Sequence, residues 1–137
     1  MLNPYLFYQD NCEAAFSFYA RVLGGKIDAM MRVSDAPPDV PRSPGREKTI
    51  MHARMSLPGG GVLMASDVPG EHFNKPQGFS ISLTVADLSE AELKFGELAD
   101  GGTVTMPFGR TFWSKGFGMG VDRFGIPWMI NCPAEGY

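Results

Sequence analysis

The spacing of apolar side chains divides the chain into short elements that occur twice in the same order. Apolar positions three and four residues apart predict helices over residues 11–23 and 88–99. Apolar–polar alternation and runs of β-branched or aromatic residues predict strands around these helices. The predicted strands cover residues 2–8, 26–33, 48–57 and 61–66 in the first half, and 78–85, 102–108, 116–122 and 126–131 in the second.

The two predicted helices belong to an internal sequence repeat. The segment DNCEAAFSFYARVLGGKI aligns without gaps on DLSEAELKFGELADGGTV, 77 residues later. Asp10-Asn11 and Asp87 are predicted to supply the N-caps. Glu13 and Glu90 lie three residues further on, where a capping box places its glutamate. Both helices end at Gly-Gly, which suits a left-handed C-cap, so each half is predicted to fold as strand, helix and three strands.

A proline-rich segment interrupts the first half. Residues 34–47 contain four prolines and show no apolar periodicity. Loops of this length are uncommon unless they act as lids or are disordered, and both alternatives stay open here. The two half-modules are then expected to span residues 1–68 and 77–133 within a single domain of 137 residues.

Composition and charge narrow the class of protein. The chain is 44% hydrophobic and 20% charged with a formal net charge of −3, which favours neither disorder nor nucleic-acid binding. No apolar run approaches the roughly 18 residues of a membrane span, so no membrane association is expected. The start, MLNPYLFYQD, lacks the features of a signal peptide, which predicts a cytoplasmic protein. Cys12 and Cys132 are then expected to be reduced, with a reactive Cys12 thiol as the alternative.

Segments along nearly the whole chain resemble the PhnB-like branch of the vicinal oxygen chelate (glyoxalase/bleomycin resistance/dioxygenase) superfamily. The most specific of them is DRFGIPWMIN, at residues 122–131. Further similar segments are NCEAAFSFY with its Gly-Gly, IMHARM, LMASD and TFW. The resemblance implies an α+β fold in which tandem βαβββ modules form a cupped mixed sheet. It also implies a small-molecule ligand and a homodimer.

The resemblance locates the positions at which superfamily members hold a divalent metal. In those proteins the first and fourth strands of each module supply inward ligands, usually His, Gln or Glu. The corresponding positions here are Asn3, Met64, Ser80 and Met129. An amide, a hydroxyl and two thioethers are poor ligands for Zn²⁺, Ni²⁺, Fe²⁺ or Mn²⁺. This departure from the family pattern predicts a protein that works without a metal or another cofactor.

His52 is the candidate catalytic residue. Strand alternation places it on one face with Arg54 and Ser56, where an imidazole acts as a general base or hydrogen-bond donor, or has a purely structural role. Ser80, Ser82 and Thr84 share a face as well, which is typical of a polar-lined cleft. The predicted substrate-binding residues are Asn3, Tyr5, Met64, Ser80, Ser82, Phe117 and Met129.

Two functions are compatible with these residues. The first is metal-independent binding of a small, partly apolar molecule in the cup, with Tyr5, His52 and the serines as polar contacts. The alternative is an enzyme of lyase, isomerase or transferase type that uses His52 as its acid or base. The glycine run at residues 116–120 does not indicate a nucleotide site, because a turn and a strand follow it and no helix N-terminus does.

Overall fold

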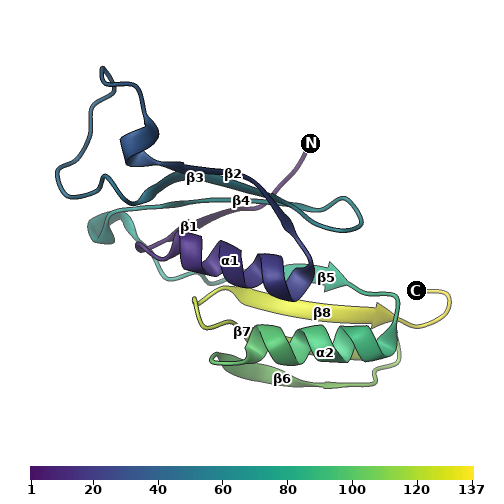
Figure 1. The fold of residues 1–137 in the computed structure, drawn as a ribbon. Helices are drawn as coiled ribbons and strands as arrows, with labels where there is room; N and C mark the ends of the chain where they lie inside the picture. The colour runs from purple at the N-terminus through teal and green to yellow at the C-terminus, as the bar shows by residue number, and fades with distance from the viewer. The chain divides into compact units, whose positions relative to one another are not determined.

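The chain forms two compact units with the same order of elements. The computed structural model describes all 137 residues, and the units are Met1–Asn74 and Lys75–Tyr137. We call them the N-terminal and C-terminal modules. Each contains a strand, a helix and three further strands in chain order (Figure 1), so the predicted repeat is confirmed.

The helices and strands lie close to their predicted positions. The N-terminal module consists of β1 (Tyr5–Tyr8), α1 (Cys12–Leu23), β2 (Lys26–Arg32), β3 (Ile50–Ser56) and β4 (Val62–Asp67). The C-terminal module consists of β5 (Ile81–Thr84), α2 (Leu88–Ala99), β6 (Thr103–Gly109), β7 (Ser114–Val121) and β8 (Pro127–Pro133). Short 3₁₀ helices occur at Val33–Asp35 and Gly70–His72. Neither α-helix combines the length and the apolar character needed to cross a bilayer.

Each module has one mixed four-stranded sheet. The strand orders are β1-β4-β3-β2 and β5-β8-β7-β6. The first strand of each module runs parallel to the fourth, and the other neighbours are antiparallel. The fold class is therefore α+β, as predicted. This order pairs the first strand with the fourth, which places Tyr5 beside Met64 and Ser82 beside Met129.

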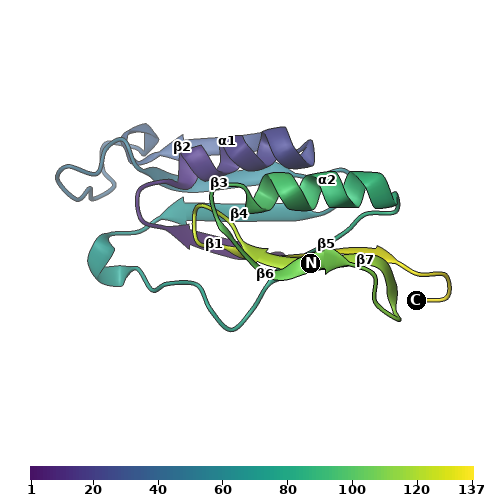
Figure 2. The ribbon, with the colours of Figure 1, turned by 90° about the horizontal axis from the view of Figure 1, so that it is seen from below.

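One helix covers one face of each sheet (Figure 2). In the N-terminal module, residues of α1 at helical spacing, among them Phe16 and Tyr19, are fully buried against the sheet. Tyr8 on β1 reaches into the same core, where its hydroxyl donates to the Tyr19 hydroxyl at 3.1 Å. Among the buried side chains that the sheet contributes are Leu6, Tyr8, Ala53, Met55, Leu63 and Ala65.

Glycines on β7 let α2 and its neighbours approach the C-terminal sheet closely. Gly116, Gly118 and Gly120 are buried at alternate positions. A Cβ atom on Gly118 would lie 2.8 Å from Cε1 of Phe95 on α2, so the aromatic ring occupies the space of the missing side chain. The glycine run therefore serves helix–sheet packing.

The start of α2 has the predicted N-cap but not the reciprocal bond of the predicted capping box. Asp87 is the N-cap, and its carboxylate accepts a hydrogen bond from the Glu90 backbone N–H at 2.9 Å. This bond satisfies one of the free N–H groups of the first turn. The Glu90 side chain pairs with Lys94 at 2.7 Å, one turn along the helix.

The capping box predicted for α1 is wrong. Asp10 adopts a left-handed conformation with φ 67°, so the helix begins one residue later than the repeat suggests. Asn11 is the N-cap, and its side chain makes no capping hydrogen bond. The carboxylate of Asp67, at the end of β4, accepts instead from the backbone N–H of Cys12 at 2.9 Å and of Ile50 at 2.8 Å. A distant strand residue thus caps α1 and ties it to the sheet.

The proline-rich segment at residues 34–47 contains little regular structure beyond the end of the 3₁₀ helix. The Ser34 backbone N–H donates to the Glu47 carbonyl at 2.9 Å, which closes the base of the segment. Arg46 forms an ion pair with Asp10 at 2.8 Å. The two ends of this segment are therefore bonded to each other, and one of them is also bonded to the residues that precede α1.

Candidate functional site

The residues that the sequence singles out in the first half gather on the sheet surface opposite α1. We call the surface of each sheet opposite its module's helix the open face. The apolar members of the N-terminal open face are well exposed, with exposed fractions of 39% for Tyr5, 53% for Phe7 and 40% for Met31. Exposed apolar clusters of this kind mark binding surfaces. The N-terminal open face is formed by Tyr5, Phe7, Met31, His52, Arg54, Ser56 and Met64.

Tyr5 and His52 form the centre of this open face. β4 lies between β1 and β3, and the Tyr5 side chain reaches across it, which brings Tyr5 Oη within 3.2 Å of His52 Nδ1. The two rings stack with centroids 5.8 Å apart, and Phe7 tilts against Tyr5 at 5.3 Å. When the phenol donates to Nδ1, the neutral imidazole carries its proton on Nε2. That N–H is then available to donate to a ligand.

A charged network lies beside the aromatic pair. Arg54 on β3 pairs with Asp28 on β2 at 2.9 Å, and the Ser56 hydroxyl donates to the same carboxylate. The pairing register of β2 shifts between Ile27 and Ala29, and this bulge leaves Asp28 out of the ladder and directed at Arg54. Arg54 is therefore neutralised within the face. Asp28 was not among the predicted site residues, because a bulge leaves no clear trace in the apolar–polar alternation.

The C-terminal open face is neutral and rich in small hydroxyls. Ser82 and Thr84 on β5 lie beside Met129 and Asn131 on β8, and Ser80 precedes β5 on the same alternation. Asn131 Oδ1 is buried and has no hydrogen-bond partner. Buried polar atoms without partners are rare, so Asn131 is a candidate ligand contact that the sequence analysis missed. The face is formed by Ser82, Thr84, Phe117, Met119, Met129 and Asn131.

The strand pairing shows which residues lie directly opposite Met64 and Met129, and they are not the predicted Asn3 and Ser80. Tyr5 lies opposite Met64 and Ser82 opposite Met129, whereas Asn3 precedes β1. A phenol, a hydroxyl and two thioethers are poor donors for divalent transition metals. Among all 137 residues, no group of three or more His, Cys, Asp or Glu side chains is placed to hold a metal ion. The residues at these positions do not fit the divalent metal that the resemblance implies.

Cys12 is not a reactive thiol. Burial, together with the neighbouring carboxylates of Asp67 and Glu13, raises the pKa of the Cys12 thiol to about 12. The thiol is therefore protonated at neutral pH, and protonated thiols are poor nucleophiles. Cys132 is also buried, and its Sγ donates to the Ala86 carbonyl at 3.4 Å.

The tandem modules and their open faces define a known class of protein. Residues 1–130 match the model of the Glyoxalase/Bleomycin resistance protein/Dioxygenase superfamily. The chain belongs to this superfamily. The fold class and the family that the sequence indicated are confirmed by this match.

Three individual proteins are similar to the chain over nearly its full length. Protein YjdN from Escherichia coli is 30% identical over 138 residues, which cover 95% of this chain and 93% of YjdN. The crystal structure of protein PA1353 from Pseudomonas aeruginosa is 44% identical with a TM-score of 0.87, covering 97% of both chains. A PhnB protein from Bacillus cereus is 26% identical with a TM-score of 0.78, covering 95% of this chain and 97% of its own. The resemblance to PhnB-like proteins is therefore confirmed.

Proposed function

We propose that this protein binds a small, partly apolar organic molecule on the open faces of its sheets, without the divalent metal of its superfamily. The observation that carries the proposal is the Tyr5–His52 pair, whose hydrogen-bonding atoms are 3.2 Å apart. Around that pair lie exposed aromatic and thioether side chains, among them Phe7 and Met31. A few fixed polar groups within an apolar surface are typical of small-molecule sites.

The geometry suits a ligand with an aromatic or aliphatic body and one carbonyl or hydroxyl oxygen. The body packs on Tyr5, Phe7 and Met64, and the ligand oxygen accepts a hydrogen bond from His52 Nε2. On the C-terminal open face, taken by itself, Asn131 Oδ1 offers an acceptor to a donor group of a molecule bound there. Further proposed ligand contacts are the predicted residues Asn3, Ser80, Ser82, Phe117 and Met129.

Binding can be measured with N-phenyl-naphthylamine, a neutral apolar dye that fluoresces when it leaves water. We expect saturable binding by the whole chain and displacement by small aromatic alcohols and ketones. Tyr5→Ala removes the central ring and should weaken dye binding about tenfold or more, because a buried aromatic contact contributes on the order of 1.5–3 kcal/mol. Met129→Glu tests the C-terminal open face separately.

Two control variants make the result specific. His72→Gln changes the other histidine, which is exposed in the 3₁₀ helix Gly70–His72 after β4, and should leave dye binding unchanged. His52→Gln should spare the dye, which offers no carbonyl or hydroxyl group, and should weaken the displacing ketones. Equal loss in the His72 and Tyr5 variants, or no saturable binding by the wild type, would contradict the proposal.

The metal-independent part of the proposal has its own test. Protein purified without chelators should contain less than about one tenth of an equivalent of any divalent transition metal, because thioethers and hydroxyls bind such ions weakly. Elemental analysis by mass spectrometry measures this content. One stoichiometric ion that is lost in a variant with both Met64 and Met129 changed would contradict metal-independent binding.

The enzyme alternative rests on the same pair of residues. A phenol held against an imidazole nitrogen can assist proton transfer to or from a small carbonyl compound. If a displacing ketone is converted, His52→Gln should abolish turnover while dye binding persists. Conversion that survives the substitution would remove His52 from the catalytic role.

The predicted homodimer is part of the proposal. Members of this superfamily commonly oligomerise, and this chain exposes large apolar side chains such as Val104 and Met106 on β6. Sedimentation equilibrium at micromolar concentration should give twice the mass of one chain. A monomer mass under those conditions would refute the dimer without affecting ligand binding by one chain.

A further inference from the structure

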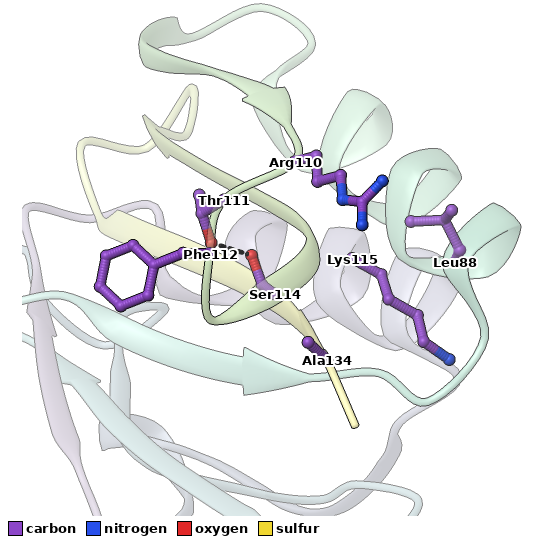
Figure 3. A pocket seen from close by; sticks show the side chains of 7 residues that line it. All are labelled: Leu88, Arg110, Thr111, Phe112, Ser114, Lys115 and Ala134. Carbon is purple, nitrogen blue, oxygen red and sulfur yellow. Dashed lines mark hydrogen bonds between the residues drawn. The ribbon is translucent and has the colours of Figure 1, made fainter. Parts of the chain in front are cut away.

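The C-terminal module has a hollow on the α2 side of its sheet, separate from the open face. It encloses about 470 Å³ and is bordered by Leu88 at the start of α2 and by the turn between β6 and β7. A Cβ atom on Gly116 would lie 2.8 Å from Leu88 Cδ1, which shows that this part of β7 faces α2. Arg110 and Lys115 contribute the charged side chains of the hollow (Figure 3).

A β-bulge directs Lys115 into the hollow. Ser114 pairs with Pro133 and Gly116 pairs with Cys132, so Lys115 is an extra residue without a partner in the ladder. Bulges re-aim side chains and are common beside functional sites. Figure 3 shows the Lys115 and Arg110 side chains extending toward the side of the hollow that Leu88 occupies.

The positive charge of this hollow is not neutralised by the protein. The ion pairs of the chain involve Arg32, Arg46, Arg54, Lys94 and Arg123, and neither Arg110 nor Lys115. The carboxylate of Asp87 caps the N-terminus of α2, and Glu90 pairs with Lys94, so the positive charge of the hollow comes from Arg110 and Lys115.

We propose that this hollow binds the phosphate group of a small phosphorylated molecule. A guanidinium and an ammonium together match a dianion better than a singly charged carboxylate. The hydroxyls of Thr111 and Ser114, which are 2.6 Å apart on the wall of the hollow, provide neutral hydrogen-bonding groups beside the cations. Leu88 supplies an apolar edge for the organic part of the molecule.

Inorganic phosphate is the simplest probe of this site. Titration of the whole chain in low-salt buffer, followed by backbone amide chemical shifts, should give saturable shifts at residues 110–115 and at the start of α2. Arg110→Gln and Lys115→Gln should each weaken phosphate binding about fivefold or more, because each removes a charge-assisted hydrogen bond. Lys75→Gln, an exposed lysine outside the hollow, should leave the affinity unchanged.

Further titrations test whether the site prefers phosphate and whether it is separate from the proposed ligand site. Chloride at matched ionic strength should produce no saturable shifts at these amides, and equal shifts would overturn the site. Tighter binding of acetate than of phosphate would overturn the assignment to phosphate. Unchanged phosphate affinity in Tyr5→Ala supports a site distinct from the N-terminal open face, and a matching loss would overturn that distinction. Unaltered thermal midpoints of the Arg110 and Lys115 variants show that weaker binding does not come from unfolding.

Discussion

The two modules share one order of elements, but they differ in how much space surrounds the second glycine after each helix. Gly25 and Gly102 are equivalent in the repeat, each just after a helix. A Cβ atom on Gly25 would meet the Sδ atom of Met55 at 2.5 Å, which is the end of a flexible side chain. A Cβ atom on Gly102 would overlap the Val121 carbonyl oxygen and lie 2.8 Å from the Asp122 carbonyl carbon. The C-terminal module therefore tolerates less change at this turn.

The open faces differ even more than the turns. The N-terminal open face combines aromatic rings with the Arg54–Asp28 ion pair, whereas the C-terminal open face presents hydroxyls, thioethers and the Asn131 amide. The repeat retains the residues that build the helix and its sheet contact. The side chains opposite the helix have diverged, as expected when function lies in a site and the fold supplies the scaffold.

The largest expected effect comes from the turn that follows each helix. Gly102→Ala should lower the free energy of unfolding by at least about 3 kcal/mol, because backbone atoms must move to admit the methyl group. Gly25→Ala should cost about 1 kcal/mol, because the Met55 side chain can rotate away. Urea unfolding monitored by circular dichroism measures both values.

Gly96→Ala is the matched control for these two variants. Gly96 lies within α2, where a Cβ atom would meet nothing within 4 Å. Alanine there should stabilise the protein by about 0.5–1 kcal/mol through helix propensity. An equal loss of stability in the Gly25 and Gly102 variants would remove the difference between the modules.

The second comparison concerns the helix starts. Asp67→Ala should cost about 2–4 kcal/mol, because it leaves the backbone N–H groups of Cys12 and Ile50 without their acceptor. Asp87→Ala removes a local cap and should cost about 1 kcal/mol. The same urea titrations apply. Asp67→Asn keeps one acceptor oxygen and should fall between these values; a cost below that of Asp87→Ala would show that α1 does not depend on the distant carboxylate.

The local elements could be predicted from the sequence because their signals are local. Helical spacing and the Asp87 cap predicted both helices within about two residues, and alternation located all eight strands. The predicted left-handed glycine C-cap is found at Gly24 of α1, whereas the C-cap of α2 is the extended Asp100. The prediction for the start of α1 was wrong because the cap comes from Asp67. The position of Asp67 beside the helix depends on the pairing of β4 with β1 and β3. No pattern within the helix itself indicates such a partner.

The candidate sites were predictable only in part. Tyr5 and His52 were each selected for their chemistry, but their contact depends on the strand order β1-β4-β3. Asp28 and Lys115 lie at bulges, where the strict alternation used to assign faces does not hold. The hollow beside Leu88 also depends on where α2 meets the β6–β7 turn, and that contact has no counterpart in the residue spacing.

The smallest expected effect concerns Cys12 and its counterpart in the repeat, the exposed Ser89 on α2. The pKa of the Cys12 thiol is about 12 in the folded protein against an ordinary value of 9.0. Because the folded state holds this proton more tightly, the resulting stability is complete below the ordinary pKa and is lost as the pH rises toward the folded-state value.

Cys12→Ser makes α1 resemble α2 at this position and removes the titrating thiol. The unfolding free energy of the wild type, relative to that of Cys12→Ser, should therefore fall by about 1.4 kcal/mol between about pH 8 and about pH 10. This fall corresponds to one proton released on unfolding over roughly one pH unit above the ordinary pKa. Subtracting the two proteins cancels the tyrosines and lysines that titrate in the same range. A difference that stays constant across this range would mean that burial does not hold the proton on Cys12, and the contrast between the buried start of α1 and the exposed start of α2 would lose its electrostatic consequence.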